Sequence, residues 1–314
     1  MKVWVTGAEG MLGSEVTRLL SQRSIEYVAT DREVDITDPA AVAEEWERHG
    51  RMEWVINCAA WTAVDAAEEH EEEAHRLNAE GPGVLSAEAA RRGGAILHIS
   101  TDYVFSGDAS SPYRPEDRPA PRSAYGRTKL AGERAVADGN DAHVIMRTAW
   151  LYGVNGKNFV STMLRLMNER EEIGVVADQY GLPTFAPDLA GAIVRIVESL
   201  RRPSLAAPGG DAGRSFGIYH YTNAGRTLKE ERSGISWYDF AMQILSSGTE
   251  EGTISASCRV NQLTTREYPT PAHRPAYSVL DAERTVATFG VERPDWLSGL
   301  RRFLQTLNER GERS

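Results

Sequence analysis

The fold is decided by residues 2–20, which read KVWVTGAEGMLGSEVTRLL. The β-branched residues up to Thr6 predict a strand, and the apolar residues that follow recur at helical spacing. Three glycines in the pattern G-x-x-G-x-x-G lie between the two elements, where they permit a tight turn, close approach of a pyrophosphate and close helix–strand packing. A plain strand-to-helix turn is the alternative, but the flanking elements favour a turn that binds a dinucleotide. The predicted cofactor contacts here are Gly7, Gly10, Met11, Leu12 and Gly13.

The alternation of strand and helix continues through the first half of the chain. Strands are predicted at residues 2–6, 25–30, 53–58, 95–100 and 143–148. Helices are predicted from amphipathic stretches at residues 11–22, 39–49, 63–75, 77–92 and 124–138. Each helix is long enough to cross over a sheet and return, which predicts a Rossmann-like, doubly wound α/β domain with a mostly parallel sheet.

After Trp150 the alternation loosens, and a smaller, irregular α/β domain is predicted. Its expected elements are a helix at 158–170, a strand at 173–177, a helix at 187–201, a surface loop at 201–217 and a strand at 218–221. A polar insertion at 226–234 precedes a helix that Ser236 opens. A last helix is indicated by the apolar stripe formed by Leu297, Leu300, Leu304 and Leu307.

Length and composition narrow the class of protein. A chain of 314 residues suggests about two domains, and 41% hydrophobic with 25% charged residues excludes a largely disordered chain. The formal charge of −10 argues against binding of nucleic acid. No run approaches the ~18 apolar residues of a membrane span, and the first residues lack a signal peptide, so we expect a cytoplasmic protein that does not contact membranes. Cys58 and Cys258 are the only cysteines and predict neither a disulfide framework nor a metal site.

The pentapeptide YGRTK at residues 125–129 is the most informative candidate for chemistry. Positions four apart share a helix face, so the Tyr125 hydroxyl and the Lys129 ammonium can point into one site. A phenol with a pKa of about 10 is a poor acid–base group at neutral pH, and a neighbouring cation favours its phenolate. Thr101 ends an apolar strand, at the rim where open α/β sheets bind ligands. Its hydroxyl could steady a carbonyl oxygen.

Acidic residues after the second predicted strand are candidates for the adenosine end of a cofactor. Asp31 lies where a carboxylate can accept hydrogen bonds from a ribose, which favours NAD over NADP. The adjacent Arg32 weakens that preference, because a guanidinium could pair with a 2′-phosphate. Asp35 and Ile36 are further candidates for the adenine pocket, with an ordinary acidic turn as the alternative.

These features together resemble the extended short-chain dehydrogenase/reductase superfamily and, within it, the family of dTDP-4-dehydrorhamnose reductases. The similarity covers nearly the whole chain. It is carried by the motifs TGAEGMLG at 6–13, INCAAWTAVDAAE at 56–68, STDYVFSG at 100–107, YGRTK at 125–129, RTAWLYG at 147–153, DQYGLPT at 178–184, GIYHYTNAG at 217–225, SWYDFA at 236–241 and RPAYSVLD at 274–281.

The resemblance implies an oxidoreductase that uses NADPH or NADH to reduce the C4 keto group of dTDP-4-dehydro-L-rhamnose. It implies a catalytic set of Thr101, Tyr125 and Lys129, in which the tyrosine gives the proton and, with the lysine, also contacts the cofactor. The cofactor is further expected to contact Ala59, Ala60 and Trp61, and the deoxysugar to contact Thr101, Asp102, Tyr103, Val104 and Trp150.

The resemblance also divides the chain. Residues 1–150 with about 186–222 are expected to form the NAD(P)-binding Rossmann domain. Residues about 151–185 with 223–314 are expected to bind the sugar nucleotide. A homodimer is the default expectation for the assembly.

Single residues bear on the other activities that similar proteins have. A dehydratase of the superfamily needs an Asp–Glu pair beside its threonine, whereas Tyr103 follows Thr101-Asp102 here. A reductase or epimerase of another nucleotide 4-keto-deoxysugar stays open. So does a non-enzymatic subunit resembling the regulatory subunit of methionine adenosyltransferase, although Trp150 stands where those subunits carry an aliphatic residue.

No metal site is predicted. Some members of the family dimerise around a magnesium ion held by glutamates, and Glu15 matches one such position, but Pro187 stands where the second is expected. The acidic run at residues 68–75, EEHEEEAH, is predicted to be a solvated helix face. His98 and His220 lie in apolar strand patterns and are predicted to be hydrogen-bonded structural histidines.

Overall fold

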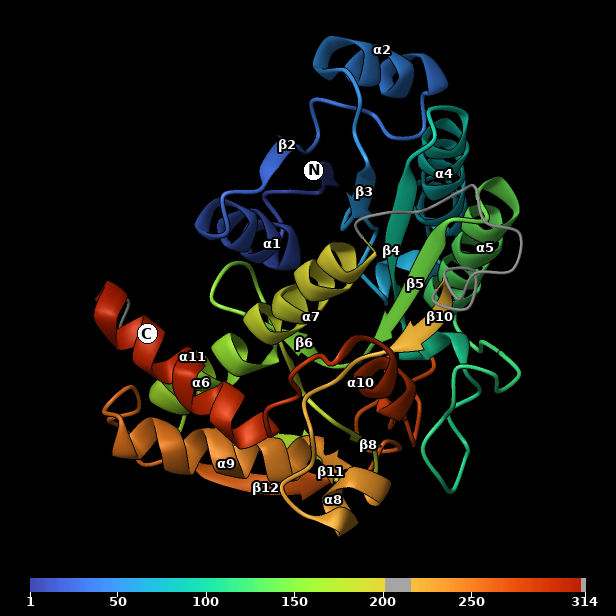
Figure 1. Cartoon of the computed structure of the whole chain (residues 1–314). Coiled ribbons are helices and arrows are strands. Elements are labelled where there is room, and N and C mark those ends of the chain that lie inside the picture. Colours follow the sequence, from blue (N-terminus) through green and yellow to red (C-terminus); the bar gives the residue numbers. More distant parts are fainter. Residues whose placement is uncertain (201–215, 312–314) are drawn as a thin grey trace.

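The computed structural model describes residues 1–200 and 216–311 of the chain (Figure 1). Of the surface loop predicted at 201–217, residues 201–215 lie outside this description, and Gly217 already belongs to a strand. Within the described part of the chain, none of the helices combines the length and the apolar character needed to cross a bilayer.

A six-stranded parallel sheet forms the centre of the N-terminal half (Figure 1). Its spatial order is β10-β5-β4-β3-β1-β2. The strands are β1 (Lys2–Thr6), β2 (Glu26–Thr30), β3 (Trp54–Asn57), β4 (Ala95–Thr101), β5 (His143–Thr148) and β10 (Gly217–His220). The chain reverses its direction of progress between β1 and β3, where open parallel sheets have their ligand crevice. The predicted doubly wound α/β fold is therefore confirmed.

Helices cover both faces of this sheet. On one face, α1 (Met11–Gln22) and α7 (Ala186–Ser199) pack on apolar side chains of β1, β3 and β5. On the other lie α2 (Pro39–His49), α4 (Gly81–Arg91) and α5 (Ala124–Gly139). Local signals start two of them. Asp38 accepts a hydrogen bond from the Ala40 amide at 2.8 Å and Ser123 accepts one from the Gly126 amide at 3.1 Å, as N-caps do.

The helix predicted at 63–75 is wrong in its first half. The chain there forms a loop and the short 3₁₀ turn η1 (Ala66–Glu68), and α3 (Glu71–His75) continues through the π-helical η2 (Arg76–Glu80) into α4. The wider π turn carries the fully buried Asn78, whose Oδ1 accepts from the Trp61 amide at 2.8 Å and whose Nδ2 donates to the Trp61 carbonyl at 3.1 Å. This contact, rather than helical periodicity, sets the path of the 59–64 loop.

The C-terminal half contains short paired strands and helices around a second apolar core. The strands are β6 (Leu151–Tyr152), β7 (Glu172–Val176), β8 (Tyr180–Gly181), β9 (Thr184–Phe185), β11 (Ile235–Ser236) and β12 (Arg259–Leu263). The helices are α6 (Phe159–Glu169), α8 (Leu228–Ser233), α9 (Trp237–Glu250), α10 (Glu283–Phe289) and α11 (Trp296–Arg310). The core lies between α6, α9, α11 and β7.

Several of these elements were not predicted from the sequence, and α8 and β12 are two of them. The polar insertion at 226–234 contains α8, which Thr227 caps by accepting from the Glu230 amide at 3.1 Å. Strand β12 pairs in parallel with β7, although its alternating exposed residues gave no strand signal. The apolar contacts of α7 and β10 lie in the first core, and those of α6, α9 and α11 in the second. The proposed division into two domains stays a prediction.

Candidate active site

A cavity of about 460 Å³ opens at the carboxyl ends of the central strands. It lies beside the switch between β1 and β3 and reaches the loop that follows β5. Residues predicted from the sequence line much of it: Gly10, Met11, Leu12, Gly13, Ala60, Thr101, Asp102, Tyr103, Tyr125, Lys129 and Trp150. Segments far apart in the sequence thus converge where this fold places its ligands.

The glycine turn has the close packing that a dinucleotide site requires. Gly7 has a φ of +65°, and a Cβ there would lie 2.6 Å from the Ala59 amide nitrogen. A Cβ on Gly13 would lie 2.1 Å from the Gly7 carbonyl oxygen, so only glycine allows α1 to approach β1. Gly10 begins α1 without a side-chain cap, which leaves the first amides of the helix directed at the cavity. Uncapped amides at a helix N-terminus suit a pyrophosphate, so these residues fit a nicotinamide dinucleotide.

The structure brings Asp31 to this turn but leaves Asp35 and Ile36 away from the cavity lining. Asp31 accepts a hydrogen bond from the Glu9 amide at 3.0 Å. Asp35 accepts from the amide and hydroxyl of Thr37 at 2.9 and 2.7 Å, and these hydrogen bonds hold its pKa below the usual value. Ile36 is buried against Gly81. Contacts within the protein therefore hold both side chains, and a role for them in binding the cofactor stays a prediction.

The positions of Ala59, Trp61 and Val104 were also predicted to contact ligands. The Ala59 amide donates to Asn57 Oδ1 at 3.0 Å, and the Trp61 backbone is held by Asn78, so both residues belong to the ordered loop at the cavity edge. Val104 is fully buried in a small apolar cluster with Phe105 and Leu130. None of the three lines the cavity.

Helix α5 delivers Tyr125 and Lys129 to the cavity because it docks closely on its neighbours. A Cβ on Gly126 would lie 2.2 Å from the Tyr103 carbonyl oxygen, in the short helix η3 (Asp102–Val104). A Cβ on Gly132 would lie 2.0 Å from the Asn78 carbonyl oxygen. The two glycines therefore fix the height and angle of α5, and with them the side chains that it points at the cavity.

Thr101 and Asp102 form a buried hydroxyl–carboxyl pair at the end of β4. The Thr101 hydroxyl donates to Asp102 Oδ1 at 2.9 Å and accepts from the Tyr103 amide at 3.2 Å. Asp102 Oδ2 is buried without a hydrogen-bond partner in the described parts of the chain. Burial raises the pKa of Asp102 to about 7, against the opposing hydrogen bond from Thr101. A carboxyl with such a pKa can hold its proton at the rim of the site.

The electrostatics of Tyr125 and Lys129 differ from the sequence expectation. Burial raises the pKa of Tyr125 further above its usual value, and a hydrogen bond with Thr101 opposes this rise. In this structure, Lys129 is not among the groups that lower the pKa of Tyr125, and its Nζ donates to the Ile99 carbonyl at 2.6 Å. Burial lowers the pKa of Lys129 to about 8, and the negative charge of Glu133 opposes this lowering. In this state the lysine is therefore close to giving up its own proton.

Trp150 has a strained backbone and a stacked ring. Its φ of +49° is unusual for a residue with a side chain. The ring stacks on Trp237 with centroids 3.4 Å apart and an angle of 8° between the planes. A Cβ on Gly181 would lie 2.5 Å from the Trp150 ring, so glycine is needed beside it. The sequence indicated Trp150 but not Trp237, because an aromatic residue in an amphipathic helix looks like part of the core.

A second cavity of about 450 Å³ lies between α6, β7 and the 268–274 segment. Tyr103 borders both cavities, and Trp237 lines the second one. The second cavity combines apolar residues such as Phe159 with two arginines, Arg170 and Arg274. Arg274 donates to the Tyr103 hydroxyl at 2.9 Å and to Asp65 Oδ2 at 2.5 Å. Sequence reasoning located the RPAYSVLD motif but assigned no role to its arginine.

The residues considered for metal binding have other partners. Arg18 donates to Glu15 at 2.8 Å, and the carboxylate that follows Pro187, Asp188, accepts from Arg302 at 2.7 and 2.6 Å. Across residues 1–200 and 216–311, no cluster of three or more His, Cys, Asp or Glu side chains is arranged to hold an ion. The acidic run at 68–75 is mostly exposed, and Glu71 pairs with Arg127 at 2.7 Å.

The chain matches one known protein family over nearly its whole length. Residues 1–309 match the model of the family described as RmlD substrate binding domain. A dTDP-4-dehydrorhamnose reductase from Burkholderia thailandensis is 41% identical over 298 residues, which are 94% of this chain and 95% of that protein.

Two further relatives are informative. A protein of Streptomyces antibioticus, named a probable dTDP-4,6-dihydroxy-2-methyloxan-3-one 4-ketoreductase, is also 41% identical, over 96% of this chain and 94% of its own length. The crystal structure of a dTDP-4-dehydrorhamnose reductase from Bacillus anthracis in complex with NADP superposes with a TM-score of 0.84. It is 35% identical and covers 97% of this chain and 99% of that one.

Proposed function

Because the chain belongs to the RmlD substrate binding domain family, we propose that it reduces the C4 keto group of dTDP-4-dehydro-L-rhamnose with NADPH or NADH. The observation that carries the proposal is the convergence of the glycine turn with Thr101, Tyr125 and Lys129 on one cavity. Reduction of a carbonyl by a nicotinamide needs a site for the cofactor pyrophosphate and a group that donates a proton. The glycine turn fits the first need, and the hydroxyls of Thr101 and Tyr125 fit the second.

The groups of the chain have complementary roles in this reaction. A bound reduced nicotinamide supplies the hydride to C4 of the sugar. Tyr125 gives its proton to the oxygen at C4, and the Thr101 hydroxyl turns from Asp102 to donate its hydrogen to the same oxygen. The raised pKa of Tyr125 keeps the phenol protonated before the reaction. Lys129 in its ammonium form then stabilises the phenolate that remains, because an opposite charge close by favours the ionised form.

The second cavity suits the nucleotide end of the substrate. Its position beyond Tyr103 and Trp237 continues the first cavity away from the glycine turn. Apolar residues such as Phe159 can contact a base, and Arg274 can pair with a diphosphate. Arg274 is now held by Asp65 and Tyr103, so substrate binding would exchange these contacts for phosphate oxygens. A sugar placed between the cavities would meet Tyr103 and Trp150.

The identity of the sugar is the finer part of the proposal. Two relatives of equal identity carry names for different 4-keto sugars, so a reductase of another dTDP-4-keto-deoxysugar is the second candidate. The absence of a glutamate after Asp102 counts against a dehydratase. The stack of Trp150 on Trp237 beside the cavity supports a built sugar site rather than a purely regulatory subunit.

The test is an assay of reduced-cofactor consumption with dTDP-4-dehydro-L-rhamnose and, in parallel, with the substrate of the Streptomyces antibioticus relative. We expect faster turnover with the first substrate and dTDP-L-rhamnose as its product. Tyr125→Phe should reduce kcat by about 10²- to 10⁴-fold, the usual contribution of a general acid, with cofactor affinity nearly unchanged. A parent protein that binds cofactor but reduces neither sugar would contradict the proposal.

Three assignments accompany this proposal and stay predictions. They are a cytoplasmic location, a homodimeric assembly and activity without a metal ion. Sedimentation analysis tests the second. Activity that disappears with EDTA and returns with magnesium would contradict the third.

A further inference from the structure

A chain of buried hydrogen bonds runs beneath the cavity from the glycine turn to Lys129. Thr6 at the end of β1 donates to Asn57 Oδ1 at 2.8 Å. Asn57 Nδ2 lies 3.0 Å from His98 Nδ1, and His98 Nε2 lies 3.4 Å from Lys129 Nζ. Asn57 and His98 are fully buried, and Lys129 is 2% exposed. A purely structural role for His98 would not explain why its ring faces Lys129.

The orientation of the Asn57 amide follows from its backbone partner. The amide of Ala59 donates to Asn57 Oδ1 at 3.0 Å, and a backbone N–H can only donate. The oxygen of the side chain is therefore on that side, and the Nδ2 group faces His98. Since Nδ2 is a donor, His98 Nδ1 must accept, so it carries no proton.

The single proton of the neutral ring is then on Nε2, which points at Lys129. Burial and the nearby Lys129 lower the pKa of His98 well below its usual value, so the ring is neutral. An Nε2–H opposite an ammonium group places two donors face to face, whereas an amine offers a lone pair to it. We propose that His98, held in one tautomer by Asn57, is a positioning residue that presents a ring N–H to Lys129 and favours its amine over its ammonium form.

The other groups around Lys129 do not cancel this effect. From α5, Glu133 favours the ammonium, and Tyr125 lies one turn earlier on the same helix. From the end of β3, burial raises the pKa of the Cys58 thiol to about 12, so Cys58 is neutral. The Ile99 carbonyl accepts one hydrogen at 2.6 Å, and an amine satisfies it as well as an ammonium does.

Lys157 also lines the same cavity, from the loop before α6, and its side chain is exposed. His98 consequently makes Lys129 lose its proton at mildly alkaline pH, which would limit turnover there because the ammonium is the form that supports the Tyr125 phenolate.

The first test reads the tautomer without any ligand. In ¹⁵N spectra of histidine-labelled protein, with His98→Gln to assign the signals, we expect a neutral His98 ring protonated at Nε2. In Asn57→Asp, a carboxylate oxygen replaces the donor that faces Nδ1. The proton should therefore move to Nδ1. A parent protein with Nδ1 protonated, or with an imidazolium ring, would overturn the proposal.

The second test rests on the proposed function and uses the pH profile of kcat/KM. His98→Gln places a side-chain carbonyl near the former Nε2–H, so the alkaline limb should move upward by roughly one pH unit, about the effect of one hydrogen bond. His220→Gln is the matched control, because His220 is equally buried but does not contact Lys129. An alkaline limb that stays in place in His98→Gln, or moves equally in the control, overturns the proposal.

The two tests can fail separately. If the parent protein reduces no dTDP sugar, the proposed function is wrong, and the spectra still decide whether His98 presents its N–H to Lys129. If the enzyme is active but the spectra show the other tautomer, only the role of His98 is wrong.

Discussion

Two sets of arginine–glutamate pairs stabilise different parts of the molecule and differ sharply in burial. Beneath the active site, Arg147 on β5 pairs with Glu133 on α5 through two hydrogen bonds of 2.8 and 2.7 Å. The two side chains are 1% and 3% exposed. Ser100, next to Thr101, also donates to Glu133 at 2.5 Å. The pair therefore links α5, β4 and β5 close to the residues that we propose to be catalytic.

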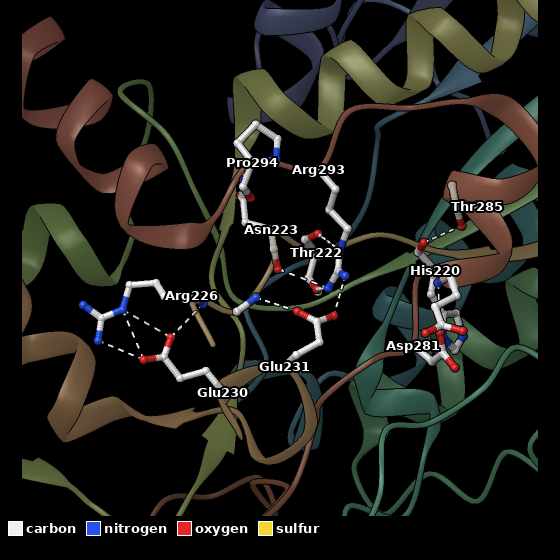
Figure 2. Close-up of polar contacts among 12 residues, drawn as sticks. His220, Thr222, Asn223, Arg226, Glu230, Glu231, Asp281, Thr285, Arg293 and Pro294 are labelled. Carbon is white, nitrogen blue, oxygen red and sulfur yellow. Dashed lines mark hydrogen bonds and ion pairs between the residues drawn. The ribbon is translucent and has the colours of Figure 1, made fainter. Parts of the chain in front are cut away.

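The second set surrounds α8, in the insertion, and is partly open to solvent (Figure 2). Arg293 bonds Glu231 and donates to the Thr222 carbonyl at 2.9 Å, with Arg293 12% and Glu231 32% exposed. Arg226 bonds Glu230 at 2.8 Å and is 41% exposed. Figure 2 shows the Glu231 carboxylate facing Arg293 beside Thr222, and the Glu230 carboxylate facing Arg226.

The same arginine–glutamate pairing therefore contributes differently to stability in the two places. A buried pair is costly to break because the remaining charge has neither water nor a partner, whereas an exposed pair loses little when water replaces a partner. We therefore expect the effects of substitution to follow burial from Arg147 down to Arg226.

The largest effect is expected for Arg147→Met. Removal of the guanidinium leaves Glu133 charged and unpaired behind the active site, which should lower the free energy of unfolding by about 3–5 kcal/mol. Urea unfolding followed by circular dichroism measures this. The double variant Arg147→Met/Glu133→Leu should recover most of the loss, since no charge is then buried alone. A double variant as unstable as the single one would mean that the packing of Arg147 on Phe105, not its charge, is what matters.

The next effect concerns Asp102, a buried carboxyl without a cationic partner in the described chain. Its pKa is raised from 3.8 to about 7, so the native protein binds a proton that the unfolded chain releases between these values. Stability should consequently fall as pH rises from about 4 to about 7. Asp102→Asn should remove this slope and, at pH 8, raise the free energy of unfolding by up to about 4 kcal/mol, the equivalent of a shift of about three pKa units. Parallel slopes for both proteins in unfolding measured across this range would contradict the assignment.

Arg293→Met should have a smaller effect, because Glu231 reaches solvent when its partner is removed. The loss also leaves the Thr222 carbonyl without its 2.9 Å hydrogen bond. We expect a decrease of about 1–2 kcal/mol in unfolding free energy, measured by the same urea titration. A loss as large as that of Arg147→Met would show that burial does not decide the order.

The smallest effect is expected for Arg226→Ala. Its pair with Glu230 is exposed, and its guanidinium lies 5.0 Å above the Trp296 ring. The expected change is below about 1 kcal/mol and should shrink further at high salt. Thermal unfolding at low and high ionic strength provides the measurement. An effect that is insensitive to salt would point to the ring contact instead of the charge.

The sequence predicted those features that depend on short patterns. The glycine turn, the strand alternation and the four-residue spacing of Tyr125 and Lys129 are local signals, and each has its expected place in the structure. Helix caps are local in the same way, because each is decided within one helical turn: Asp38 and Ser123 both accept a hydrogen bond from an amide at the start of the helix that follows.

What the sequence missed depends on contacts between distant segments. The chain from Asn57 to Lys129 joins β3, β4 and α5, and no spacing rule relates these positions. The exposed strand β12 is a strand only because β7 offers it a partner. The stack of Trp150 on Trp237 likewise requires a loop and a helix that lie far apart in the sequence.

The parallel pairing of β7 with β12 has a consequence for how the chain is made. A ribosome delivers α6 and β7 early, but β12 and α11, which complete their core, come late. During synthesis the apolar face of α6 must therefore wait uncovered, a state that favours aggregation. Slow or interrupted translation after β7 should be harmful to this half of the molecule, and chaperone binding should concentrate there.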